Sequence, residues 1–138
     1  MAYTIRKANY FYVTVQDQPG EAYELLAQLS GLGINLLAFT AIPIGPSSTQ
    51  FAIFPDDDLN LRSVAGKAGL KLDGPYPAFL VQGDDELGAL SEVHHKFYLA
   101  KVNIYASSGV SDGRGSYGYV IYVRPADFEK AAEAMGVA

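Results

Sequence analysis

The apolar positions follow two different spacings along the chain. Residues 10–15 (YFYVTV) and 78–82 (AFLVQ) are rich in aromatic and branched side chains, which is typical of strands. Each run is followed by apolar residues at helical spacing, over 22–29 in the first case and 90–97 in the second. We therefore expect each half of the chain to begin with a strand and a helix.

Both halves continue in the same way. Two strand-like runs joined by a glycine- and serine-rich hairpin follow, at 34–44 with 49–54 and at 102–110 with 117–123. A second helix is predicted to begin near Asp58, a good N-cap residue, in the first half. In the second half it is predicted to begin at Pro125, a residue suited to the first helical turn.

An internal duplication explains this repetition. Moving the sequence by 68 residues aligns 10–54 with 78–122 without a gap. The apolar pattern coincides, and several residues are identical, among them Asp17 with Asp85, Gly20 with Gly88, and Asn35 with Asn103. Because periodicity and register agree together, we interpret the chain as two copies of one unit.

The order of elements in each copy is β-α-β-β-α, one strand short of the ferredoxin-like plan β-α-β-β-α-β. The first copy has a candidate last strand at 70–72 (LKL), but the second has none before Ala138. We expect residues 2–7 (AYTIRK) to complete the C-terminal copy, or both edge strands to be exchanged; the alternative is a frayed N-terminus. The expected fold class is α+β, with antiparallel sheets and helices on one face, divided into repeats 1–73 and 74–138.

Composition narrows the classes of function. The 138 residues include 49% apolar residues, so a packed core is expected, and no apolar run approaches the length of a membrane span. The start of the chain lacks the apolar centre of a signal peptide, so the cytoplasm is the expected location. The net charge of −5 argues against nucleic-acid binding. Cysteine is absent and the two histidines are adjacent, so we expect neither thiol catalysis, nor a metal site, nor a cofactor.

The stretch after the first strand carries groups that could bind a ligand. Asp17 leaves the strand, Pro19 restricts the backbone and Gly20 permits a tight turn directly before the helix. The first N–H groups of a helix are unpaired, and with the helix dipole they suit a carboxylate. Asp17 could accept hydrogen bonds from an ammonium group, and Asn35 offers both a donor and an acceptor. Together these groups suit a free amino acid.

The stretch DQPGEAYELLAQLSGLGINL (17–36) resembles the signature of the ACT domain family. The shared features are a D-x-P-G turn, a helix with leucines at helical spacing, and G-[IV]-N-[IL]. The second copy, DDELGALSEVHHKFYLAKVNI (84–104), is degenerate, with leucine in place of the proline. The resemblance implies a regulatory module that pairs side by side with another ACT domain and binds an amino acid at the seam. With no catalytic domain in this chain, it resembles stand-alone tandem ACT proteins.

Carried over to this chain, the family pattern implies a set of ligand-binding residues. In the first copy these are Asp17, Gln18, Pro19, Gly20 and Glu21 in the turn, with Asn35 and Leu36 at the second strand; in the second copy they are Asp85, Gly88 and Asn103.

If the two copies pair, the resemblance implies two pseudo-symmetric sites. Asp17 and Gly20 would meet Asn103, and Asp85 and Gly88 would meet Asn35. The second turn carries Leu87 and the acidic run 84–86, which disfavours a ligand carboxylate. On the sequence alone, the first turn is therefore the better candidate.

Simpler interpretations stay open beside these. Asp17 can serve only as a turn former, and Asn35 can serve only the backbone at the start of a strand. His94 is expected to be half-buried or at an interface rather than catalytic.

The leading hypothesis is a non-catalytic amino-acid sensor that forms a homodimer or acts on a partner enzyme. The alternatives are an assembly module that binds no ligand, and a small enzyme using His94 or His95.

Overall fold

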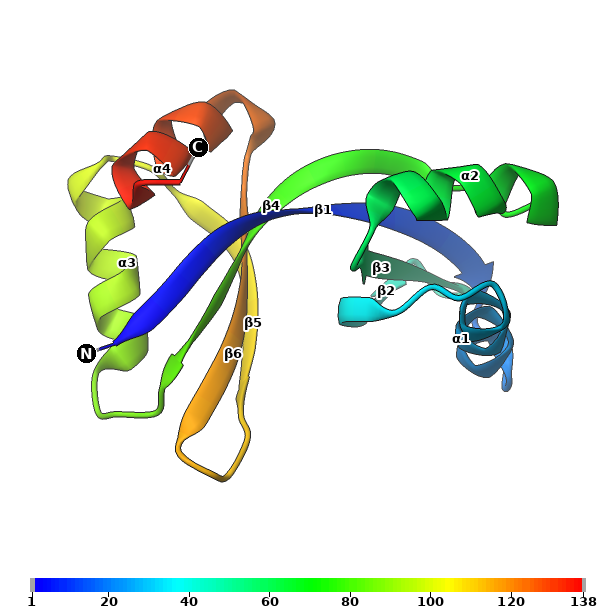
Figure 1. The fold of residues 1–138 in the computed structure, drawn as a ribbon, viewed down its shortest axis with the longest axis horizontal. Helices are drawn as coiled ribbons and strands as arrows, with labels where there is room; N and C mark the ends of the chain where they lie inside the picture. The colour runs from blue at the N-terminus through cyan, green and yellow to red at the C-terminus, as the bar shows by residue number, and fades with distance from the viewer. Residues whose placement is uncertain (1, 138) are drawn as a thin grey trace. The chain divides into compact units, whose positions relative to one another are not determined.

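A computed structural model describes residues 2–137, with four helices, six strands and one 3-10 turn in these residues (Figure 1). In chain order they are β1 (Tyr3–Gln16), α1 (Glu21–Gly31), β2 (Leu36–Ile44), β3 (Ser48–Pro55), α2 (Asp58–Ala68), β4 (Asp73–Asp84), α3 (Ala89–Leu99), β5 (Ile104–Ser111), β6 (Ser116–Val123), η1 (Pro125–Asp127) and α4 (Phe128–Met135).

The chain divides into two compact units that do not follow the order of the sequence. One unit is Asn9–Tyr76, and the other joins the described residues up to Ala8 with those from Pro77 onward. The long strands β1 and β4 therefore each contribute one part to each unit. This is why each unit has four strand segments although the chain has only six strands in the described part.

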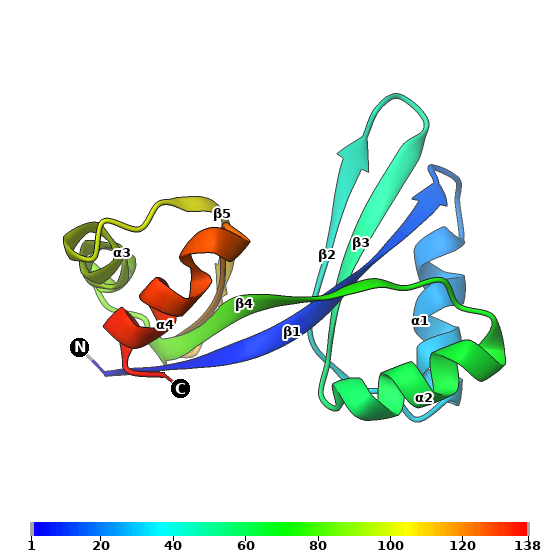
Figure 2. The same ribbon diagram turned by 90° about the horizontal axis from the view of Figure 1, so that it is seen from above.

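In the unit of residues 9–76, β3 lies between β1 and β2, and all three are antiparallel. Phe11 pairs with Ile53 in β3, and Ile53 pairs with Phe39 in β2. Helices α1 and α2 lie on one face of these strands (Figure 2). Side chains from that face and the helices form the core: Phe11, Val13, Leu25, Leu29, Ile34, Phe51, Ile53 and Leu61.

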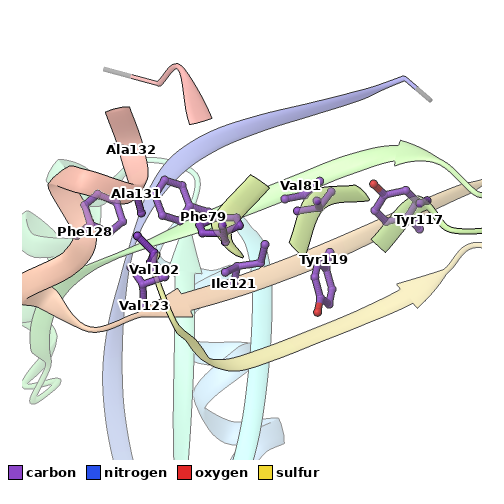
Figure 3. Packing of buried hydrophobic residues seen from close by; sticks show 13 residues of the cluster. Phe79, Val81, Val102, Tyr117, Tyr119, Ile121, Val123, Phe128, Ala131 and Ala132 are labelled. Atoms are coloured by element: carbon purple, nitrogen blue, oxygen red, sulfur yellow. The ribbon is translucent and has the colours of Figure 1, made fainter. Parts of the chain in front are cut away.

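In the other unit, β6 lies between β4 and β5, again antiparallel, with Phe79 opposite Ile121. The N-terminal part of β1 borders β4, since the Asp84 N–H donates to the Ala2 carbonyl at 3.1 Å and the Thr4 hydroxyl donates to the Gln82 carbonyl at 3.4 Å. Helices α3 and α4 cover the core, where the rings of Phe79 and Phe128 stack at 4.6 Å (Figure 3).

These arrangements confirm the predicted fold class, two ferredoxin-like βαββαβ repeats of antiparallel strands with helices on one face. The predicted division at 73/74 differs from the observed one. The boundary lies at 76/77, and residues 2–8 group with the second repeat.

Two expected details are wrong. Residues 70–72 are not a strand, because the Leu70 N–H donates to the Ala65 carbonyl in the helix cap, and β4 begins only at Asp73. The N-cap of α2 is Asp57 rather than Asp58, because its carboxylate accepts the Asn60 N–H at 3.1 Å.

The duplication is also visible in the loop hydrogen bonds. The Asp17 N–H donates to the Ser47 carbonyl at 2.9 Å, and its counterpart, the Asp85 N–H, donates to Gly115 at 2.9 Å. After α1 the Ile34 N–H reaches the Leu29 carbonyl, and after α3 that of Val102 reaches Phe97. The turn and the helix ends are therefore fixed by the same backbone contacts in both repeats.

None of the helices among residues 2–137 has both the length and the apolar character needed to cross a membrane.

Candidate functional site

Each repeat has a strand–turn–helix segment of nearly the same backbone geometry. Gly20 has φ 92° and Gly88 has φ 82°, both in the left-handed region that favours glycine. Each glycine is the N-cap of its helix, and its carbonyl accepts the N–H of the glutamate four residues later. The sequence therefore predicted the turn correctly in both copies, despite the loss of proline in the second.

Backbone N–H donors lie at the N-termini of α1 and α3. Neither helix has a side-chain cap. In α3 the Ala89 N–H donates to the Glu86 carbonyl at 3.0 Å, which leaves the next two N–H groups, of Leu90 and Ser91, at the start of the helix. Such groups carry the positive end of the helix dipole and suit an anionic oxygen.

Beside this helix start, Asp85 is held in place by the neighbouring hairpin. The Ser111 hydroxyl, on β5, donates to the Asp85 Oδ2 at 2.9 Å. A carboxylate has four lone-pair positions, so Asp85 keeps acceptor capacity for a cationic donor. Asp85 and the α3 N-terminus thus present an acceptor and donors next to each other.

A cavity of about 600 Å³ lies between these two groups and the β5–β6 hairpin. Its residues come from the second turn, the first turn of α3 and the ends of the two strands: Asp85, Glu86, Leu87, Gly88, Ala89, Leu90, Ser91, Gly109, Val110, Ser111, Tyr117 and Gly118. The volume falls in the range of small-molecule sites. The cavity combines acidic and hydroxyl groups with exposed apolar side chains, of which Leu87 and Val110 are the most exposed.

The side chains over the corresponding strand face differ between the repeats. Ser107, Gly109 and Ser111 alternate along β5, so they share one face of the strand. The aligned residues of β2 are Phe39, Ala41 and Pro43.

Their packing differs accordingly. The Phe39 ring packs on Phe51 at 5.3 Å. On the second repeat the Tyr119 ring lies over Gly109 instead, since a Cβ at Gly109 would come within 2.5 Å of that ring.

His94 joins the hydrogen bonds of the same region. Its Nε2 lies 2.6 Å from the Tyr119 hydroxyl, which donates to the Ser107 Oγ at 2.8 Å. Tyr119 is buried, and Figure 3 shows its hydroxyl on the β5 side of the core. The expectation of a half-buried His94 agrees with its intermediate exposure, and its partner is a phenol rather than a carboxylate.

The other predicted residues lie as follows. Asp17, Gln18, Pro19 and Gly20 are exposed, and the Gln18 amide contacts the Gln16 side chain.

Asn35 and Asn103 are also exposed, each directly before a strand whose first pairing is irregular. The Asn35 carbonyl accepts the Asp56 N–H at 2.9 Å, so its backbone has a structural role, while its side chain remains exposed. Leu36 packs against the first core and is only partly buried.

Sequence reasoning missed Ser111, Gly109 and Tyr117. Nothing about a serine in a hairpin indicates a contact with Asp85, which is 26 positions away. The available signal was the alignment itself, which pairs Ser111 with a proline and Gly109 with an alanine.

Tyr117 lines the cavity, yet its hydroxyl is buried without a hydrogen-bond partner among the described residues. Burial raises the pKa of this hydroxyl above its ordinary value, and Tyr3, Glu92 and Asp84 raise it further. Tyr117 therefore stays neutral at physiological pH.

Within residues 2–137, no group of three or more histidine and carboxylate side chains is placed to hold a metal ion.

Comparisons with solved structures identify the fold. Protein BT0572 from Bacteroides thetaiotaomicron superposes with a TM-score of 0.75 at 16% identity, covering 97% of this chain and 88% of that one. The ligand-free regulatory subunit of aspartate kinase from Thermus thermophilus superposes with a TM-score of 0.60 at 18% identity, covering 98% of this chain and 93% of that one. The regulatory subunit of aspartate kinase from Thermus flavus superposes with a TM-score of 0.54 at 23% identity, covering 98% of this chain and 94% of that one.

This chain has the tandem ACT-domain fold. No protein-family model and no curated protein sequence matches it. At these identities the likeness concerns the ACT fold alone, so the function has to be argued from the site.

Proposed function

We propose that this chain is a non-catalytic regulatory protein that binds a small ligand, a free amino acid, at a turn of its ACT-like repeats. The observation that supports it best is the cavity of about 600 Å³ at the second turn, where Asp85 stands beside the uncapped start of α3. The likeness to regulatory subunits of aspartate kinase supports a regulatory role.

The chemistry fits a zwitterion. A ligand carboxylate would accept from the N–H groups of Leu90 and Ser91, where the helix dipole stabilises negative charge. A ligand ammonium would donate to Asp85, whose orientation is fixed by Ser111. The ammonium also offsets the negative charge of Glu86, which otherwise disfavours a carboxylate in this place.

The two turns are not equivalent in this proposal. The sequence alone favours the first turn, because it keeps the proline and carries less negative charge. The cavity supports the second. The pairings of Asp17 and Gly20 with Asn103, and of Asp85 and Gly88 with Asn35, stay predictions, as do a homodimer, a regulated partner enzyme and a cytoplasmic location.

Calorimetry of the full chain against the twenty amino acids tests this function. We expect at least one to bind, Asp85→Asn to weaken it at least tenfold, and Asp17→Asn, the matched change in the first repeat, to have a smaller effect. A charged hydrogen bond of about 1.5–3 kcal/mol corresponds to such a loss.

Two outcomes count against the proposal. If the folded wild type binds none of the twenty, the chain is better explained as an assembly module that acts without a ligand. If Asp17→Asn abolishes binding and Asp85→Asn does not, the site is the first turn.

A further inference from the structure

The cavity beside Asp85 includes apolar surface as well as polar groups. Leu90, in the first turn of α3, is one of the residues that line it. Four residues further along the helix, the His94 Nε2 lies 2.6 Å from the Tyr119 hydroxyl in the sheet. Because residues four apart lie on the same face of a helix, Leu90 also faces the sheet. It is nevertheless 40% exposed, so the cavity leaves an apolar side chain uncovered at this position.

Tyr117, on β6, gives the cavity a second apolar surface. It lines the cavity, but its hydroxyl is buried. Figure 3 shows this hydroxyl pointing in the opposite direction from that of Tyr119, which bonds to Ser107 on β5. The Tyr117 side chain therefore offers the cavity its ring rather than its oxygen.

The cavity has few polar groups left for the side chain of a ligand. Among the described residues that line it, none has a basic or an amide side chain. The Ser111 hydroxyl already donates to Asp85, and Ser91 lies beside the N–H groups assigned to the ligand carboxylate. A second carboxylate or an amide on the ligand would therefore lack a partner, which is unfavourable. Glu86 could pair with a cationic side chain, but it is exposed, and exposed ion pairs contribute little.

Resting on the proposed function, we infer that the ligand is an amino acid with an apolar side chain, which packs against Leu90 and the Tyr117 ring. The polar groups of the cavity then hold the ammonium and the carboxylate, and Leu90 is a specificity-determining residue. The first repeat has Ala22 and Thr49 at the aligned positions, so it lacks this apolar surface.

The test is calorimetry on the full chain with amino acids of matched shape. L-leucine, L-asparagine and L-aspartate have side chains of the same size and branching, which end in methyl groups, an amide and a carboxylate. The wild type should bind leucine roughly tenfold or more tightly than the other two, because neither polar end finds a partner. L-norleucine should bind at least as tightly as L-lysine, which has the same carbon chain with an ammonium added.

Four variants separate the role of Leu90 from a general effect on the helix. Leu90→Ala should weaken leucine binding roughly three- to tenfold, because contact area is lost, and should reduce its advantage over asparagine. Leu90→Ile keeps the apolar volume and should retain most of the affinity. Leu99→Ala changes an exposed leucine of α3 outside the cavity and should have no effect. Tyr117→Phe removes only the buried hydroxyl and should leave leucine binding unchanged.

Three outcomes contradict the inference. It is wrong if the tightest ligand among the twenty amino acids has a charged or an amide side chain, if Leu90→Ala leaves the preference for leucine unchanged, or if Leu99→Ala weakens leucine binding as much as Leu90→Ala does. In each of these cases, weaker binding to Asp85→Asn would show that the proposed function still stands. If the folded wild type binds no amino acid, the proposed function fails first.

Discussion

The two repeats share their backbone but differ in the side chains beside the turn. On the first, the Phe39 ring covers the strand face and packs on Phe51. On the second, Ser107 lies at the aligned position, and the Tyr119 hydroxyl forms hydrogen bonds with Ser107 and His94. Duplication thus preserved the elements that fix the turn and changed the side chains that pack beside it.

The motif that identifies the turn is better preserved in the first repeat, whereas the cavity described above lies at the second. Preservation of a turn motif and capacity for a ligand therefore have to be tested separately, using matched substitutions in the two repeats.

The largest expected effect concerns the cores, where the repeats should behave alike. Phe11 and Phe79 are aligned, and both are almost fully buried, at 1% and 0% exposure. We expect Phe11→Ala and Phe79→Ala each to destabilise its own unit by about 3–5 kcal/mol. Hydrogen exchange should show faster opening confined mainly to the mutated unit. A cost below about 1 kcal/mol at either site would contradict the equivalence of the two cores.

The next largest effect, a loss of stability caused by added volume on β5, should distinguish the repeats. Gly109→Ala places a methyl group within 2.5 Å of the Tyr119 ring, so the ring or the strand must shift. We expect a loss of about 1–3 kcal/mol in the free energy of unfolding, measured by denaturant titration. Ala41→Gly is the matched change in the first repeat and should cost only about 0.5–1 kcal/mol, from backbone entropy. Unchanged stability of Gly109→Ala would mean that Tyr119 moves freely.

Two tyrosines of β6 should respond in opposite directions to loss of the hydroxyl. Tyr119→Phe removes the bonds to His94 and Ser107, and should destabilise by about 1–3 kcal/mol. Tyr117→Phe removes a buried hydroxyl that has no partner, and should be neutral or stabilise by up to about 1 kcal/mol. Equal losses in the two variants, in denaturant titration at pH 7, would contradict this assignment.

The free energy of unfolding at alkaline pH tests the buried Tyr117 hydroxyl in a second way. Because burial raises the pKa of Tyr117, the folded state holds this proton more tightly than the unfolded state does. The resulting stability is present below about pH 10, the ordinary tyrosine pKa, and is lost as the pH rises above it. The alkaline decline in the free energy of unfolding should therefore be shallower in Tyr117→Phe than in the wild type. An identical decline would contradict the pKa shift.

The sequence was sufficient for the repeat and the turns, since these depend on local periodicity and on residues such as Gly20 and Gly88. It was insufficient for the long strands. Residues 70–72 have the composition of a strand, but Leu70 is used by the cap of α2, and β4 continues from one unit into the other.

The cavity could not be predicted for a different reason. It depends on which side chains of β5 and β6 meet Asp85 and α3, and therefore on tertiary contacts such as that between Ser111 and Asp85. Strand register decides these contacts, and a single sequence does not specify register.

The smallest expected effect lies after α1 and α3, where the repeats differ by a single residue type. Gly33 and Lys101 are aligned, and both have positive φ, 79° and 59°. Each N–H donates to the carbonyl three residues earlier, at 3.0 Å, so the same turn is made with and without a side chain.

A left-handed backbone costs a residue with a Cβ about 1–2 kcal/mol, whereas glycine loses about 0.5–1 kcal/mol in chain entropy. Lys101→Gly should therefore raise the free energy of unfolding by about 0.5–1 kcal/mol, and Gly33→Lys should lower it by a similar amount. Denaturant titration of both variants measures this difference. Effects of the same sign would show that Lys101 makes a compensating contact that the first repeat lacks, and the two helix ends would then differ in more than their backbone requirement.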